Sequence, residues 1–169
     1  MSNDNSYWKI HNIPILGRVL FLINLKQDSI SAIIPETHKN FDSYQQQYLS
    51  LQDSPLVDYA AHQIIEYING ERMTFDSIFN PCGGHFQLSV WSTLAKTNYG
   101  TTYSYKDIAS MMYIPGSYRA VASAIAANPL LIVIPCHRVI PKNQTIGNYS
   151  AGKILKEKLL GIESRHKKY

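Results

Sequence analysis

The sequence predicts an α+β protein: an N-terminal α/β domain with a small antiparallel sheet, then a mostly helical C-terminal domain with a helix-turn-helix of the winged-helix type. Two observations predict it. Strand-like apolar runs are confined to residues 7–35, whereas apolar residues beyond residue 84 recur at helical spacing. Hydrophobic residues make up 45% of the chain, enough for a folded core, and no run approaches the ~20 apolar residues of a membrane helix.

A change in composition near residue 84 indicates a domain boundary. Residues 72–83 read as a linker, and the sign of the charge changes there. Residues 1–83 hold 5 Lys/Arg against 9 Asp/Glu, a balance of −4, whereas residues 84–169 hold 11 against 3, a balance of +8. We therefore expect two domains, 1–83 and 84–169. The second either attracts a polyanion such as nucleic acid or carries a solvated basic face.

Strands are expected early in the first domain. Residues 18–25 and 29–34 alternate or run apolar, and residues 26–28 form a polar break between them. Residues 35–53 are polar and predict a loop or an irregular helix.

A helix follows these elements. Ser54 can cap it, Pro55 suits its first turn, and Asn69 with Gly70 ends it. The apolar residues expected on one face of this helix are Leu56, Tyr59, Ala60, Ile64 and Ile68.

The second domain predicts four helices. The first spans the apolar positions from Phe86 to Leu94, and the second begins with Ser104 and Asp107 as a capped start. The others are expected over residues 118–127, capped by Ser117, and residues 153–160. The middle pair, joined by a Gly-containing turn, forms the helix-turn-helix pattern, although many such pairs bind nothing.

Residues 118–127 are small after Arg119. Alanine is the best helix former, so this composition suits close packing between helices. It also suits entry into the DNA minor groove, which is only ~6 Å wide. In that case Arg119, with its planar and permanently charged guanidinium, could occupy the space left by an extruded base.

Cys136 follows an apolar run and is flanked by Pro135 and His137. Such a cysteine is often a buried core residue, but a neighbouring base could make it a nucleophile. Glu163 lies 26 residues beyond His137, just past the last expected helix, where it could orient the imidazole. Cys82 and Cys136 lack the paired spacing of a zinc site, so no metal is expected.

The second domain resembles the O6-alkylguanine-DNA alkyltransferases, also called methylated-DNA–protein-cysteine methyltransferases. The resemblance runs in order over residues 86–163, with matching spacing. The segments that carry it are Phe86-Gln87 with Val90-Trp91, Ser104-Tyr105, Arg119-Ala120-Val121, Asn128-Pro129, Pro135-Cys136-His137-Arg138-Val139, Gly147-Asn148-Tyr149-Ser150, and Leu159-Leu160 through Glu163. Residues 1–83 match only loosely, as the variable N-terminal domain of the same family.

The resemblance implies direct DNA repair. Cys136 would take the alkyl group from the O6 atom of a guanine flipped out of duplex DNA into a pocket on the minor-groove side. His137, acting through a water, would remove the thiol proton, and Glu163 would orient His137. Tyr105 would donate a proton or hydrogen bond to guanine N3. A thioether is not hydrolysed, so one protein molecule would react once and need no cofactor.

The resemblance also implies binding roles. Val139 would read the exocyclic amine through its backbone, Tyr149 and Ser150 would line the pocket, and Asn128 would hold the bend before the active site. Arg138 is expected to anchor structure. The residues expected to contact DNA are Ser104, Arg119, Ala120, Ser123 and Ala124.

Two departures from the family pattern are visible. Gly83-Gly84-His85 stands where many bacterial members have Gly-Thr-Pro, which leaves the linker geometry open. Ser150-Ala151-Gly152 replaces Ser-Gly-Gly and could stiffen the pocket loop.

We expect a monomer that partners double-stranded DNA containing O6-alkylguanine, with no membrane partner. Residues 1–5 are polar and lack a signal-peptide pattern, so a cytoplasmic location is expected. Two alternatives stay open: a sequence-specific helix-turn-helix regulator with Cys136 in its core, and a cysteine hydrolase of a small substrate. The repair hypothesis requires a sulfur that an extruded purine can reach.

Overall fold

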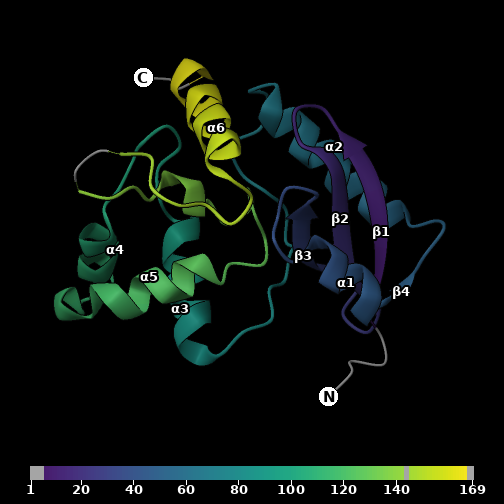
Figure 1. Cartoon of the computed structure of the whole chain (residues 1–169), viewed down its shortest axis with the longest axis horizontal. Helices are drawn as coiled ribbons and strands as arrows, with labels where there is room; N and C mark the ends of the chain where they lie inside the picture. Colours follow the sequence, from purple (N-terminus) through teal and green to yellow (C-terminus); the bar gives the residue numbers. More distant parts are fainter. Residues whose placement is uncertain (1–5, 143–144, 167–169) are drawn as a thin grey trace. The chain divides into compact units, whose positions relative to one another are not determined.

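The computed structural model describes residues 6–142 and 145–166, and the polar N-terminal segment 1–5 lies outside them. The chain divides into two compact units, Met1–Pro81 and Cys82–Tyr169. The α+β class expected from the sequence is confirmed, with strands in the first unit and helices in the second (Figure 1).

The described part of the first unit forms a four-stranded sheet in the order β3-β2-β1-β4. Strands β1 (Ser6–Ile13), β2 (Gly17–Asn24) and β3 (Ser29–Pro35) pair antiparallel. Strand β4 (Leu49–Ser50) pairs parallel to β1, so the sheet is mixed where a purely antiparallel one was expected. The indole of Trp8 donates to the Tyr48 carbonyl (2.8 Å) and holds this short strand against the sheet.

Helices cover both faces of the sheet, which explains why the central strand β2 is buried along most of its length. On one face, Phe41 of α1 (Phe41–Gln47) joins a core cluster with Leu20, Leu22, Ala32 and Ile34. The alternate residues of β2 point to the other face, and α2 (Pro55–Ile68) packs against β1 and β3.

Helix α2 confirms the expected bounds and cap. The hydroxyl of Ser54 accepts from the Val57 amide (3.3 Å), Pro55 lies in the first turn, and Asn69 is the C-cap. Tyr59 does not lie on the buried face as expected, because its side chain is 47% exposed and its hydroxyl donates to Asp76.

The expected linker, residues 72–83, is partly bound to the sheet of the first unit. The amide of Ile30 donates to the Ile78 carbonyl (2.7 Å), and the Asn80 amide donates to the Ile30 carbonyl (2.9 Å). At the start of the second unit, a Cβ on Gly83 would lie 2.6 Å from the Trp91 ring. Glycine is therefore required at position 83 for the chain to cross this indole.

The second unit is helical. Its helices are α3 (His85–Ala95), α4 (Tyr105–Met111), α5 (Tyr118–Ala126) and α6 (Lys153–His166), with the 3-10 turns η1 (Pro115–Ser117) and η2 (Cys136–Arg138). Helix α4 begins with the expected capping box, since the Ser104 hydroxyl accepts from the Asp107 amide (3.2 Å) and Asp107 accepts from the Ser104 amide (2.7 Å). Ser117, however, makes no side-chain cap, because η1 runs directly into α5.

Helix α5 packs against α3 and α4. Its inner residues Val121, Ala124 and Ile125 are buried, and the Trp91 indole of α3 donates to the Ala124 carbonyl (2.8 Å). Helix α6 continues to His166, beyond the end expected at residue 160, so Glu163 lies inside the helix and not after it.

Candidate active site

The nucleophile candidate lies in a tight turn behind an apolar segment. The described chain after α5 runs through the buried residues Leu130–Ile132 and enters η2 at Cys136, whose amide donates to the Ile134 carbonyl (2.7 Å). A 3-10 turn brings the side chains of adjacent residues closer in direction than a strand does. Cys136 and His137 can therefore belong to one site.

Asn128 holds the bend that joins α5 to this turn. Its amide nitrogen donates to the Ile134 carbonyl (2.9 Å) and to the Cys136 sulfur (3.0 Å), while its oxygen accepts from the Leu130 amide (3.0 Å). The side chain is buried, and these contacts satisfy both ends of its amide.

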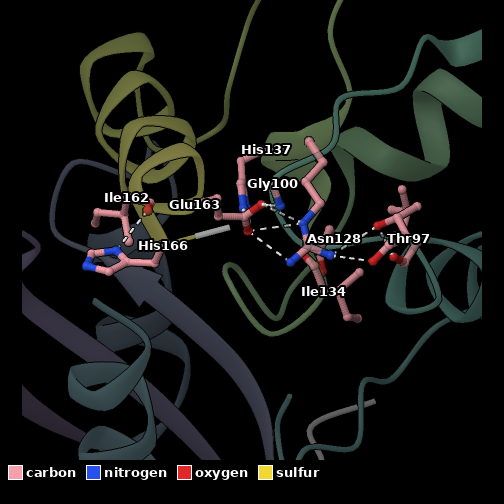
Figure 2. A network of polar contacts seen from close by, with 10 residues as sticks. Thr97, Gly100, Asn128, Ile134, His137, Ile162, Glu163 and His166 are labelled. Carbon is pink, nitrogen blue, oxygen red and sulfur yellow. Dashed lines mark hydrogen bonds and ion pairs between the residues drawn. The ribbon is translucent and has the colours of Figure 1, made fainter. Parts of the chain in front are cut away.

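His137 and Glu163 lie in direct contact (Figure 2). The Nε2 atom of the imidazole is 2.9 Å from Oε1 of Glu163, and both side chains are fully or almost fully buried. The arrangement gives the imidazole one carboxylate neighbour, which fixes its orientation.

Arg138 and the backbone complete the shell around Glu163. The Arg138 guanidinium donates to both carboxylate oxygens (2.9 and 3.0 Å) and to the Thr97 carbonyl (2.6 Å), and the Gly100 amide donates to Oε2 (2.8 Å). Burial alone would raise the pKa of Glu163, but the bonds from His137 and Arg138 lower it to about 2. Glu163 is therefore an anion at neutral pH.

His137 is a neutral base in this setting. Burial lowers the pKa of His137, and the hydrogen bond to Glu163 opposes that change only in part. A neutral imidazole whose Nε2 donates to the carboxylate carries its lone pair on Nδ1, which is the atom that can accept a proton.

The thiol of Cys136 is covered in this structure. The residue is 5% exposed, and burial raises the pKa of the thiol, opposed by the hydrogen bond from Asn128 and the charge of Lys156. The sequence led us to expect a sulfur that a purine can reach, and the structure instead shows a closed arrangement. Tyr149 closes it, since its hydroxyl is hydrogen-bonded to the sulfur.

The other expected pocket residues lie around this sulfur to different extents. Tyr105, at the start of α4, is half-buried, and burial together with the charge of Cys136 raises the pKa of its phenol. The pKa of Tyr149 is raised well above its usual value by burial and the same charge, so both phenols keep their protons at neutral pH. Val139 is buried, whereas Ser150 is partly exposed.

The residues expected to contact DNA divide between two faces of α5. Arg119, Ala120 and Ser123 are exposed. Ala124 is 4% exposed, so the expectation that it contacts DNA is wrong: helical periodicity turns its methyl group toward α3. Ser104 is partly exposed, and its hydroxyl caps α4.

Sequence reasoning missed Lys156. This side chain is 1% exposed, and its ammonium donates to the Val139 carbonyl (2.6 Å), next to the nucleophile's turn. A signal was present, because Leu155, Lys156, Leu159, Ile162 and Glu163 share one face of α6 at helical spacing. Thr97 and Gly100, which bond the charged cluster through their backbone, left no such pattern.

Among the described residues, no group of three or more His, Cys, Asp or Glu side chains is arranged to hold a metal ion. A search of the same residues finds no helix with the length and apolar character needed to cross a membrane.

The second unit matches a known family model. Residues 85–165 match the DNA-binding domain of 6-O-methylguanine DNA methyltransferase. The inducible methylated-DNA–protein-cysteine methyltransferase of Bacillus subtilis is 42% identical over 117 residues, which are 69% of this chain and 65% of that protein. The methyltransferase of Methanosarcina barkeri is 42% identical over 107 residues, 63% of this chain and 68% of that protein.

Solved structures match nearly the whole chain. The O6-methylguanine methyltransferase of Mycobacterium tuberculosis superposes with a TM-score of 0.83 at 27% identity, covering 96% of this chain and 95% of that one. A crystal structure of the same organism's OGT in complex with DNA gives a TM-score of 0.81 at 28% identity, covering 95% and 94%.

Proposed function

The chain belongs to the methylated-DNA–protein-cysteine methyltransferase family, and from that premise we propose that it repairs DNA directly by moving an alkyl group from O6-alkylguanine to Cys136. The observation that carries the proposal is the buried pair of His137 and Glu163, with Nε2 and Oε1 2.9 Å apart, next to the cysteine in η2. The second domain, 84–169, is the alkyl-acceptor and DNA-binding domain in this proposal.

The reaction begins with loss of the thiol proton. Nδ1 of neutral His137 accepts it through a bridging water, and the anionic Glu163 stabilises the resulting imidazolium. The sulfur then attacks the alkyl carbon, forming the S–C bond as the bond from carbon to O6 breaks. The electron pair of that bond stays with the purine.

The purine leaves as neutral guanine. Tyr105 supplies a proton or hydrogen bond to N3, and its raised pKa supports this role because the phenol remains protonated. Val139 reads the exocyclic amine through its backbone, Tyr149 and Ser150 line the pocket, and Asn128 holds the thiol through its 3.0 Å contact.

The closed thiol requires movement before the reaction. An extruded base reaches the sulfur only after the Tyr149 hydroxyl gives up its bond to Cys136, so the loop that carries Tyr149 opens or Tyr149 rotates. Extrusion itself costs a few kcal/mol, and Arg119 offsets it by filling the gap in the base stack. The exposed face of α5, with Ala120 and Ser123, lies against the minor groove in this proposal.

The product is a thioether on the protein, which water does not cleave, so each molecule reacts once. The partner is double-stranded DNA containing O6-alkylguanine, the protein acts as a monomer, and no cofactor takes part.

The test is incubation with duplex DNA containing O6-methylguanine, followed by peptide mass spectrometry. We expect one methyl group on the peptide that holds Cys136 and at most one equivalent transferred. Transfer to Cys82, or no transfer, would contradict the proposal. Turnover beyond one equivalent would instead indicate a hydrolase, and sequence-specific dimeric binding that survives Cys136→Ala would indicate a regulator.

A further inference from the structure

Tyr113 is held in an unfavourable backbone conformation at the turn of the helix-turn-helix. Its φ is 60°, in the left-handed region, and its side chain is 94% exposed. The turn ends α4, since the Tyr113 amide donates to the Ser110 carbonyl and the Ile114 amide to the Ala109 carbonyl (both 2.9 Å). Glycine is the usual residue at such a position because it has no Cβ.

Other left-handed residues have a visible compensation. Ile132 (φ 77°) is 1% exposed, so core packing offsets its backbone strain. Asp28 (φ 45°) is a polar residue of a type that tolerates this region in turns. The ring of Tyr113, exposed to water, has no comparable packing, and retaining a bulky side chain there favours a role outside the free protein.

The surroundings of Tyr113 indicate which partner it meets. We define the turn surface as Lys106, Met111, Tyr113, Tyr118 and Arg119. The Lys106 ammonium and the Arg119 guanidinium lie 5.4 and 5.9 Å from the centre of the Tyr118 ring. Met111 is 42% exposed. Exposed aromatic rings beside cations suit a polyanion that also offers sugar and base faces.

We propose that Tyr113 contacts the backbone of duplex DNA, with its ring against a deoxyribose and its hydroxyl donating to a phosphate beside Lys106. The inference rests on the proposed function, which brings α5 to the DNA. Contacts of this kind position a protein on the duplex without reading sequence, so Tyr113 sets affinity and register and takes no part in the chemistry.

The test uses the full chain and the substitution Tyr113→Gly. Binding to an undamaged 20-base-pair duplex, measured by fluorescence anisotropy, should weaken roughly three- to tenfold, the effect of one lost hydrogen bond with its packing. The same substitution should raise the melting temperature by about 2–4 °C, because the left-handed backbone is no longer strained. Tyr113→Phe, which keeps the ring, should lose only part of the affinity.

The matched control is Ile15→Gly. Ile15 also has a left-handed φ (63°) and is 45% exposed, but it lies in the first unit. Its variant should bind DNA as the wild type does. Methyl transfer from free O6-benzylguanine should stay unchanged in Tyr113→Gly, since the free base needs no duplex.

Wild-type affinity in Tyr113→Gly would overturn the inference while leaving the proposed function intact. The reverse failure is separate: a wild type that binds undamaged DNA but transfers no methyl group contradicts the proposed function alone. Self-association of the wild type that Tyr113→Gly abolishes, with unchanged DNA affinity, would assign the turn surface to a second copy of the chain and overturn the inference. Tyr113→Asn, which tolerates the same φ, repeats the test if the glycine variant does not fold.

Discussion

Lys156 is a cation buried next to the nucleophile. Its ammonium donates to the Val139 carbonyl (2.6 Å), and the Val139 amide donates to the Cys136 carbonyl (3.1 Å). Its charge lowers the pKa of the Cys136 thiol, against the larger effect of burial, while burial lowers the pKa of Lys156 itself. A buried cation without a role would be costly, so its position favours a function in stabilising the thiolate.

Replacing Lys156 with Met should therefore raise the pKa of Cys136 further and slow its reaction at pH 7, by roughly tenfold for each unit of pKa. Raising the pH should restore the rate, which a merely structural role would not allow. The measurement is the pH profile of Cys136 alkylation by iodoacetamide in a Cys82→Ser background. Lys153→Met, an exposed position on the same helix, serves as control, and an unshifted profile for Lys156→Met would refute the role.

The His137–Glu163 pair predicts how stability depends on pH. Both groups have folded pKa values below their unfolded ones, so both contribute stability at high pH that is lost in acid. His137 should reduce the free energy of unfolding as the pH falls below 6.5, and Glu163 between its ordinary value of 4.5 and about 2. The Glu163 contribution is on the order of 3 kcal/mol.

Urea denaturation at a series of pH values measures this dependence. The variant Glu163→Gln should be less stable at pH 7 because Arg138 loses its buried counter-ion, and its stability should change less between pH 4.5 and 2 than that of the wild type. An equally steep acid loss in the variant would assign the effect to other carboxylates.

At the scale of elements, local signals predicted what local contacts determine. The hydroxyl of Ser54 and the Ser104–Asp107 pair define helix starts within one turn of chain, and both were predicted correctly. The two-residue strand β4 depends on the Trp8 indole bonding to Tyr48, 40 residues away, which no local pattern reveals. Helix α6 continues past Gly161 because Ile162 and Glu163 are buried beyond it, and this tertiary contact overrides the weak helix propensity of glycine.

The site shows the same division. The order of motifs predicted that His137 and Glu163 belong together, and they lie 2.9 Å apart. The covered thiol was not predicted, because closure depends on how the segment around Tyr149 folds back onto Cys136.

Gly147 determines the path of that segment. Its φ is +66°, and a Cβ would lie 2.7 Å from Pro141. Gly147→Ala should therefore lower the free energy of unfolding by roughly 1–2 kcal/mol, and it should slow methyl transfer because Tyr149 shifts. Thermal denaturation and single-turnover kinetics measure both. Gly116→Ala, where the Cβ meets open space, should leave stability nearly unchanged, and equal losses in the two variants would contradict the argument.

Helix α5 predicts a difference between duplex and free-base substrates. Arg119 is exposed at its start, and the proposed role of its guanidinium is to fill the base stack. Arg119→Ala should slow repair of duplex DNA by at least tenfold more than it slows the reaction with free O6-benzylguanine, because only the duplex requires extrusion. Single-turnover rates on both substrates measure this. Equal losses would remove the intercalating role.

At the scale of the whole molecule, charge separates the two units. Residues 1–83 carry a balance of −4 and residues 84–169 one of +8, so the attraction for DNA comes from the second unit. Electrostatic attraction of this kind is independent of sequence and damage, and it brings the protein to undamaged DNA before any lesion is found. The slow step of extrusion then takes place on a protein already bound.

This distribution predicts the salt dependence of binding. The affinity for undamaged duplex should fall linearly on a log–log plot against salt concentration, because each phosphate neutralised by Lys or Arg releases a counter-ion. Lys106→Ala in the second unit should reduce the slope by about 1, whereas Lys39→Ala in the first unit should leave it unchanged. Reaction with free O6-benzylguanine should not depend on salt, since that substrate is uncharged. A slope altered equally by both substitutions would mean that the first unit also contacts the phosphates, and the acidic half of the chain would then need a different role.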